Sequence, residues 1–544
     1  MSSTTFDLPS FEKESSTGLK RKASFANLSD ENKSMKELPL SLISRLLNLP
    51  PVLFQEIFSN YLYYNDIARF DKAVCNHADR DRYLSLLNGM VISNPFWCIR
   101  TSNQLAWIYM RQIRLESVGF GCEINEEDLC TLYPLHWLSV KQWYFEWGPS
   151  VDAESIVECL KQCTSLGELN FNIFDPNEDI FDEEYVEAIL TLFELSDFCA
   201  HLRKITLGSY LFTNDATIKA ISNHCHNLVH LDFGDYETSN ISPEVMMVFL
   251  VRCGAHLEKL DFLSLYFFND SNVVQAIKFC PRLTTIKLRA PSSVVMKEIG
   301  RCYPELMDLT INSFKRDTDE ELIALFEGCR KIQKLCIEFS IISERALIRI
   351  FECCCDIRHI SFRSVPMTAL CLEKLAVNCV QLTYLVLSSL EISKADLNEF
   401  SINSRFPNLV SLYCGKVNIG DRFLLEFARK SPLLWKICLY SCMYISDVGV
   451  HHIASHCRNL TEISFSNMAG IYSPDYLIDI LINNPKIKKS GFRFGGINLI
   501  NVPLIFDGNS NENDGDTVFT TELKALLDSR AVYHKWITVS GFIV

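Results

Sequence analysis

The apolar and polar positions of this chain repeat about every 26 residues. The motif C-x-x-L-x-x-L-x-L occurs, for example, as CTSLGELNF at 163–171, CHNLVHLDF at 225–233 and CVQLTYLVL at 379–387. Related copies, some with one extra residue and some without the cysteine, extend the series over residues 115–495. Apart from one step of 36, successive copies lie 23 to 29 residues apart. About fifteen copies at this spacing indicate a repeat architecture.

Each copy combines a strand-like half with a helix-like half. In ELNF at 168–171, apolar residues alternate with polar ones, which is typical of a short half-buried strand. The other half carries helix-start signals such as Ser242-Pro243, where the missing N–H of proline is harmless. Such a unit buries its apolar face only by stacking on neighbours. We therefore expect residues 115–495 to form a curved α/β solenoid, with a parallel sheet on the concave face and helices on the convex face.

Cysteine usage supports the repeat. The chain has 544 residues and 22 cysteines. Ten cysteines are predicted at one repeat position, the turn from helix to strand: Cys163, Cys199, Cys225, Cys253, Cys280, Cys302, Cys329, Cys354, Cys379 and Cys457. A small buried apolar group is needed there, and free cysteine behaves as one. The N-terminus does not resemble a secretory signal and no C-x-x-C pair occurs, so we expect reduced thiols, not disulfides or zinc ligands.

Charge and motif content exclude several function classes. The formal net charge is −14, which argues against bulk binding to nucleic acid. No apolar stretch approaches the roughly 18 residues of a membrane helix. The phosphate-binding, dinucleotide-binding, H-E-x-x-H and G-x-S-x-G motifs are absent. We expect a protein without catalytic residues or cofactor, located in the cytoplasm or the nucleus.

Two patterns invite a metal interpretation. Asp175, Asn177 and Asp179 open like a calcium loop, but Ile180 and Val186 stand where that loop needs glycine and glutamate. His452 and His456 lie four residues apart on a predicted helix. They fall on solvent-facing positions of the convex side, so we expect no metal there either.

The repeats resemble a known family. The segment LWKICLYSCMYISDVGVHHIASHC at 434–457 is similar to the cysteine-containing leucine-rich repeats of F-box proteins. The segment LPPVLFQEIFSNYLYYNDIARFDKAVC at 49–75 resembles the F-box itself. The positions that carry this resemblance, or follow from it, are Leu49, Pro50, Leu53, Phe54, Ile57, Phe58, Leu62, Asp66 and Ile67. The resemblance implies a small all-α module at 45–90 whose apolar residues dock on the Skp adaptor of a cullin-based ubiquitin ligase.

This segment departs from the family pattern in three places. One extra residue lies before Leu62, another lies before Val74, and Ala78 replaces the usual tryptophan. Each extra residue rotates the following side chains by about 100° on a helix. An alternative is therefore that residues 45–110 form only a helical cap for the first repeat.

The remaining segments complete the predicted organisation. Residues 1–36 are rich in Ser, Lys and Glu, which predicts a disordered tail. Residues 91–114 are expected to be linker and capping helices. Residues 496–544 are expected to form a C-terminal cap with an acidic loop, DGNSNENDGD, at 507–516.

The repeat register also predicts a target-binding surface on the concave face. Solvent-facing strand positions are acidic in the early repeats and become basic and tyrosine-rich later. Tyrosine and arginine commonly anchor protein interfaces. The candidates are Lys287, Arg289, Arg363, Tyr384, Tyr413, Lys436 and Tyr440.

The family resemblance implies a non-enzymatic substrate receptor of a Skp–cullin–F-box ubiquitin ligase. Its partners would be the Skp adaptor, through it a cullin, and a target protein of unknown identity. The alternative is a leucine-rich-repeat interaction scaffold with no ligase role.

Overall fold

A computed structural model describes most of the repeat region and the module that precedes it. The described residues are 45–60, 64–74, 79–93, 98–123, 137–145, 153–171, 183–208, 212–233, 241–262, 265, 268–313, 319–339, 342–389, 403–468, 480, 483–484 and 492–495. The predicted tail at 1–36, the calcium-like loop opening at 175–180, the cap at 496–544 and Leu62 lie outside them.

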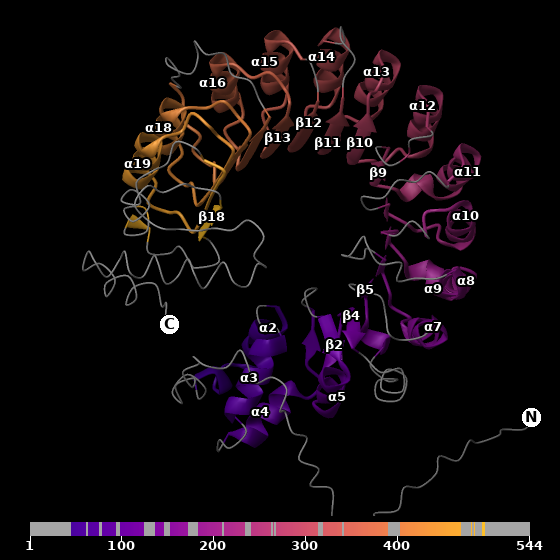
Figure 1. Ribbon diagram of the computed structural model, residues 1–544. Coiled ribbons are helices and arrows are strands. Elements are labelled where there is room, and N and C mark those ends of the chain that lie inside the picture. Colours follow the sequence, from indigo (N-terminus) through magenta and orange to yellow (C-terminus); the bar gives the residue numbers. More distant parts are fainter. Residues whose placement is uncertain are drawn as a thin grey trace, which may run out of the picture.

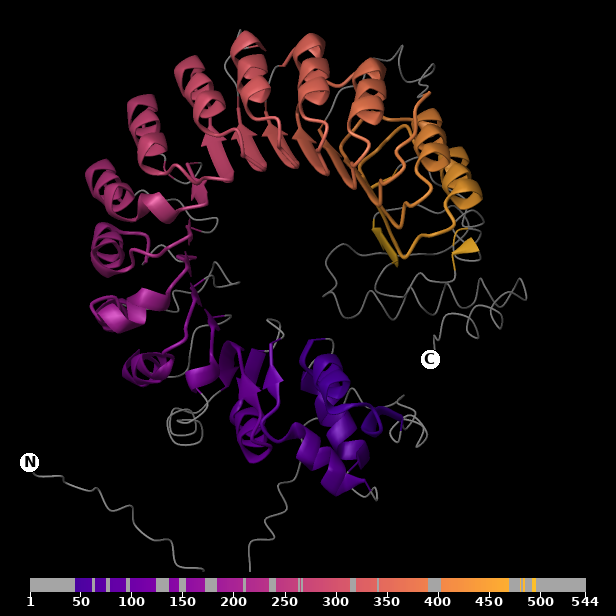
Figure 2. The same cartoon turned by 180° about the vertical axis from the view of Figure 1, so that it is seen from behind.

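The repeat units form an open arc with the strands on its inner side and the helices on its outer side (Figures 1 and 2). Sixteen strands of the described residues form one parallel sheet, in chain order from β2 to β18 without β3. They are β2 (Cys98–Thr101), β4 (Ser117–Glu123), β5 (Gln142–Phe145), β6 (Glu168–Asn170), β7 (Lys204–Thr206), β8 (His230–Asp232), β9 (Lys259–Asp261), β10 (Thr285–Arg289), β11 (Asp308–Asn312), β12 (Lys334–Glu338), β13 (His359–Arg363), β14 (Tyr384–Ser388), β15 (Ser411–Gly415), β16 (Lys436–Tyr440), β17 (Glu462–Ser466) and β18 (Phe492–Gly495). This is the leucine-rich-repeat solenoid, so the predicted fold class is confirmed.

Helices cover the convex side of the sheet (Figure 1). Those described are α7 (Ala153–Gln162), α8 (Glu183–Leu192), α9 (Ser196–His201), α10 (Asp215–His224), α11 (Pro243–Cys253), α12 (Asp270–Phe279), α13 (Ser293–Cys302), α14 (Asp319–Gly328), α15 (Glu344–Cys353), α16 (Ala369–Asn378), α18 (Asp421–Lys430) and α19 (Asp447–His456). Pro243 occupies the first turn of α11, as predicted from the Ser-Pro pair.

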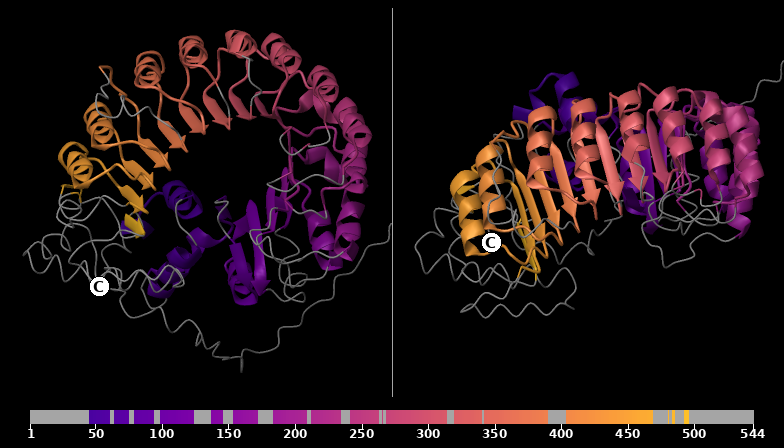
Figure 3. Two further views of the ribbon diagram at one scale, coloured as in Figure 1. Left: turned by 45° about the horizontal axis from the view of Figure 1, so that its top comes forward. Right: turned by 90° about the horizontal axis from the view of Figure 1, so that it is seen from above.

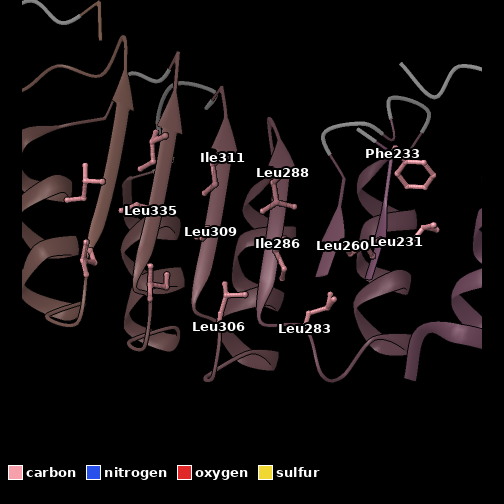
Figure 4. Close-up of a cluster of buried hydrophobic side chains, with 14 of the residues drawn as sticks. Leu231, Phe233, Leu260, Leu283, Ile286, Leu288, Leu306, Leu309, Ile311 and Leu335 are labelled. Atoms are coloured by element: carbon pink, nitrogen blue, oxygen red, sulfur yellow. The ribbon is translucent and has the colours of Figure 1, made fainter. Parts of the chain in front are cut away.

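The core lies between the sheet and the helices. Leu260, Ile286, Leu309 and Leu335 are in register on four successive strands, and each is fully buried. Figure 4 shows these side chains in a row on one face of the sheet. Burial of each such side chain stabilises the fold by about 1.5 to 3 kcal/mol. Because every unit shares this row with its neighbours, no single repeat completes a core alone.

A left-handed residue follows each strand from β10 to β17. Its φ lies between 40° and 66°, although none of these residues is glycine: Ala290, Ser313, Phe339, Ser364, Ser389, Lys416, Ser441 and Asn467. From β10 to β16 its amide donates to the carbonyl of the last residue of the next strand, at 2.6 to 2.9 Å. This bond extends the ladder by one step and turns the chain away from the sheet.

The repeated cysteine position has a hydrogen-bonding role. The Cys354 thiol donates to the Cys329 carbonyl and the Cys379 thiol to the Cys354 carbonyl, both at 3.5 Å. Burial raises the pKa of Cys354, and it raises that of Cys379 to about 12, so these thiols remain protonated donors at neutral pH. The cysteines whose side chains the structure describes are free thiols.

The prediction for Cys302 is wrong. Cys302 ends α13 and is partly exposed, whereas Tyr303 follows it as the capping residue and is buried. The Tyr303 hydroxyl lies 2.9 Å from the carbonyls of both Ile277 and Cys280. A hydroxyl on a ring therefore replaces the thiol in this repeat, and the cysteine one position earlier misled the alignment of motifs.

Replacing Tyr303 with phenylalanine should lower the free energy of unfolding by about 1 kcal/mol, because two buried carbonyls lose their shared donor. Urea denaturation of the full chain measures this effect. Tyr444→Phe is the control, since Tyr444 is 58% exposed. Equal stability of the Tyr303 variant and the wild type would contradict the assigned role.

Acidic residues at several helix starts link one repeat to the next. The Asp215 carboxylate accepts from the Ser242 amide at 2.7 Å and from its hydroxyl at 2.9 Å. Asp421 accepts from the Ser446 amide at 2.8 Å and from its hydroxyl at 2.6 Å. These bonds satisfy groups at the helix N-termini and fix the stacking of adjacent helices.

The sheet begins earlier than the motif predicts. Residues 91–114 contain helix α5 (Ser102–Met110), but also β2, which is the first strand of the solenoid sheet. Strands β1 (Val91–Ile92) and β3 (Arg114–Leu115) form a separate two-stranded sheet. An all-α module of α2 (Pro51–Asn60), α3 (Tyr64–Val74) and α4 (Arg80–Leu87) precedes them. This module lies at the N-terminal end of the arc, whereas α19 lies near the other end (Figure 3).

Candidate functional site

The helical module has its own aromatic core. Phe54 and Phe58 stack with ring centroids 4.1 Å apart, and Phe70 meets Phe58 edge-on at 5.3 Å. Tyr83 of α4 lies 5.4 Å from Phe70. All four rings are buried. The amphipathic pattern of 49–75 therefore folds three helices around one aromatic cluster.

A buried carboxylate joins this module to the solenoid. Asp71 of α3 accepts from Arg80 of α4 at 2.7 Å, from Trp107 Nε1 of α5 at 3.0 Å and from Arg111 at 3.2 Å. Burial opposes ionisation of Asp71, but the hydrogen bonds from Trp107, Arg111 and Arg80 outweigh it and hold the pKa of the carboxyl below its ordinary value. The sequence pattern alone did not predict the role of Asp71. The available signal was that an aspartate stands on the otherwise apolar face of α3.

A second anchor positions α2. The Ser59 hydroxyl, near the end of α2, donates to the Val91 carbonyl at 2.7 Å and accepts from the Ser93 amide at 3.1 Å. Ser59 itself is buried. The end of α2 is thus held at a defined place relative to the first strands.

The predicted adaptor-binding residues separate into two groups. Phe54, Phe58 and Ile67 are fully buried, so they stabilise the module and offer no contact surface. In the other group, Pro50 and Leu53 are exposed, and Leu49 and Ile57 are half-buried against the core. Asp66 lies within α3, but its side chain is outside the described residues, as is all of Leu62.

The structure adds one residue to the exposed group. Val52 is 74% exposed and lies beside Leu53, which is 46% exposed. The Pro-Pro-Val-Leu run at 50–53 was the available signal, because four apolar residues in sequence cannot all face one helical core. We call Val52 and Leu53, with the flanking Leu49 and Ile57, the α2 patch.

The concave-face candidates lie in two places. Lys287 and Arg289 are on β10, whereas the other five are on β13, β14, β15 and β16. Tyr384 and Tyr440 are 42% and 39% exposed, and Tyr413 is half-buried. The structure therefore brings the second group together and leaves the β10 pair three strands away.

Ion pairs between neighbouring repeats occupy much of the concave face, mainly in the early repeats. Lys287 Nζ lies 2.6 Å from Asp261 Oδ2, and Lys334 Nζ lies 3.1 Å from Asp308 Oδ2. Further pairs of this kind are Lys141–Glu116, Lys204–Glu168, Lys259–Asp232 and Lys436–Glu462. Where both side chains are exposed, such pairs contribute little stability, but each pair neutralises charge that would otherwise be available to a partner. The sequence pattern alone did not predict these ion pairs. Their signal was that an acid in one repeat and a lysine in the next stand at the same strand position, as Asp261 and Lys287 do.

The later concave face carries a different set of side chains. Arg363 places its guanidinium 4.9 Å from the ring centroid of Phe339, which is 49% exposed. Tyr384 stacks on His359 with centroids 5.7 Å apart. Burial and the nearby Lys334 lower the pKa of His359, so this imidazole is neutral at pH 7. Aromatic rings and an exposed cation thus gather on β12 to β14.

The structure offers no support for a metal site in its described part. No group of three or more His, Cys, Asp or Glu residues there could hold a metal ion. His456 directs Nδ1 toward the His452 carbonyl at 3.0 Å, and its Nε2 accepts from Arg429 at 3.4 Å. Both ring nitrogens are therefore engaged. Over the same residues, no helix has the length and hydropathy needed to cross a membrane.

No protein-family model matches the chain. Among solved structures, it is similar to the yeast Rad7–Elc1 complex, at 12% identity over 84% of this chain and 92% of that chain, with a TM-score of 0.44. It is similar to the internalin InlF of Listeria monocytogenes, at 13% identity over 81% and 96% of the two chains, with a TM-score of 0.30. A third is the TLR13–ssRNA13 complex, at 12% identity over 78% and 57%, with a TM-score of 0.31.

Proposed function

We propose that the protein is a non-catalytic substrate receptor of a Skp–cullin–F-box ubiquitin ligase. In this proposal the α2 patch binds the Skp adaptor, and the concave face of the solenoid holds a target protein. The chain then contributes proximity between target and ubiquitin-conjugating enzyme and supplies no catalytic group. It would act in the cytoplasm or the nucleus.

One observation carries the proposal: Val52 and Leu53 are exposed although the module has a complete core of its own. A buried aromatic cluster already stabilises the three helices, so these side chains are not needed for folding. Leu53 and Ile57 are four residues apart and share one face of α2. Apolar side chains at this spacing are the anchors that a helix presents to a groove on another protein.

The test is copurification of the full chain with the Skp adaptor and a cullin. The double variant Val52→Asp with Leu53→Asp should recover at least 10-fold less adaptor, because two carboxylates would enter an apolar contact. The matched control is Leu370→Asp with Val377→Asp on α16, where the two side chains are 46% and 49% exposed. This control should retain the adaptor. No adaptor with the wild type, or equal recovery by both variants, would refute the proposal.

The alternative is an interaction scaffold in which the module only caps the solenoid. The Asp71 cluster favours it, because that carboxylate fastens α3 and α4 onto α5 as a cap requires. In that case the wild-type chain would retain no adaptor while its concave face still bound a partner.

A further inference from the structure

Three tyrosines lie on a diagonal across three adjacent strands. Tyr413 pairs in register with Val386, two residues beyond Tyr384 on β14. Tyr440 pairs with Gly415, two residues beyond Tyr413 on β15. Strands lie about 4.8 Å apart and two residues span about 6.7 Å, so successive tyrosines are separated by roughly 8 Å. We call Tyr384, Tyr413 and Tyr440 the tyrosine diagonal.

Neighbouring residues hold these rings in place. Tyr384 stacks on His359, as described above. The Tyr413 ring lies over Gly415, where an added Cβ would be 2.8 Å from the tyrosine hydroxyl. The Lys416 ammonium is 5.9 Å from the ring centroid of Tyr440. The diagonal is therefore an ordered surface, and its two outer rings are exposed.

The charge around the diagonal differs from that of the whole chain. On β13, β14, β15 and β16, the strand positions that face solvent on the concave side carry no carboxylate, although the net charge of the chain is −14. Arg363 and Lys416 are exposed at the ends of β13 and β15. The nearest strand acids are Glu338 on β12, which is in register with Arg363, and Glu462 on β17, which forms an ion pair with Lys436. Lys416 has no strand acid in register with it on β14 or β16.

We infer that the tyrosine diagonal binds an extended, acidic segment of a partner protein. Alternate residues of an extended chain point to one side and are about 6.7 Å apart, close to the spacing of the tyrosines. Apolar side chains of the segment would then contact the rings, while its carboxylates would face Arg363 and Lys416. The inference rests on the target-binding half of the proposed function and specifies the chemistry of the target.

Selection from a display library of random 12-residue peptides tests the inference on the full chain without adaptor. The selected peptides should be enriched in Asp and Glu, with apolar residues at alternate positions. Their affinity should fall as salt rises from 0.05 to 1 M, because exposed charges are screened. Selection of no binder, or of peptides without acidic enrichment, would overturn the inference.

Variants then locate the binding surface. Tyr384→Ala with Tyr440→Ala should weaken a selected peptide at least 10-fold, as should the charge reversal Arg363→Glu. These exposed side chains make small contributions to the core, and circular dichroism checks the fold. The matched control is Thr310→Ala on β11, which should bind normally. Unchanged affinity in a folded Arg363 or tyrosine variant would refute the assignment.

A single-stranded nucleic acid would also stack on aromatic rings, so a fluorescent 20-nucleotide poly(U) probe is included. We expect no binding of this probe. Binding that the tyrosine variant abolishes would overturn the acidic-segment assignment. Adaptor copurification is scored separately, so loss of the adaptor and loss of the peptide are distinguishable.

Discussion

We expect Gly328→Ala to lower the free energy of unfolding by about 3 kcal/mol, because the new methyl group would overlap backbone atoms that cannot move independently. A Cβ on Gly328 would lie 2.1 Å from the Gly300 carbonyl oxygen and 2.6 Å from the carbonyl carbon. Gly300 is on α13 and Gly328 ends α14, so the change forces two neighbouring convex helices apart. The effect comes from close approach, since no positive φ is involved at Gly328.

Urea denaturation followed by circular dichroism measures this loss. The control is Gly167→Ala, where the nearest atom to an added Cβ is 3.7 Å away. It should change stability by less than about 0.5 kcal/mol. A Gly328 variant as stable as this control would show that the two helices separate without cost.

The second prediction concerns the buried carboxylate of the helical module. Asp71→Asn should lower the free energy of unfolding by about 3 kcal/mol, because it leaves Arg80 and Arg111 without their shared counter-charge. The three side chains are 12% to 21% exposed, so water compensates only in part. Melting of the module alone, ahead of the solenoid, is the expected form of the loss.

The Asp71 contribution should depend on pH in a defined direction. Its pKa is lowered in the folded chain, whereas an unfolded aspartate titrates near about 3.9. The stabilisation is therefore complete above about pH 4 and is lost as pH falls through the lowered pKa. Thermal melts of the wild type and Asp71→Asn should differ at pH 7 and converge in acid. The exposed control Glu154→Gln should follow the wild type, and a gap between wild type and variant that stays constant with pH would contradict this account.

The solenoid could be predicted because its signal is local and repeated. Leu169 and Phe171 alternate with polar residues in one strand, and both are fully buried. The same pattern recurs in every unit, so an error in one repeat is corrected by the others. The error at Cys302 arose because the buried position needs a donor and not a particular residue, and the Tyr303 hydroxyl satisfies it.

The candidate sites were less predictable for a geometric reason. Leu53 and Phe54 are adjacent in one apolar segment, yet Leu53 is 46% exposed and Phe54 is buried. A one-dimensional pattern marks both as apolar and does not say which faces the module's own core. Likewise, the sequence predicted that Lys287 contacts a target protein, but Asp261 on the preceding strand neutralises its charge.

From the amino-acid order alone, the fold class, the length of the repeat and the face of each strand residue follow, because burial of apolar side chains imposes fixed periods on strands and helices. Contacts between residues far apart in the sequence needed the folded chain. These include the pairing of lysines with acids on neighbouring strands, the fastening of Asp71 to α5 and the alignment of three tyrosines across β14, β15 and β16. They depend on the stacking register and the curvature, which no single repeat specifies.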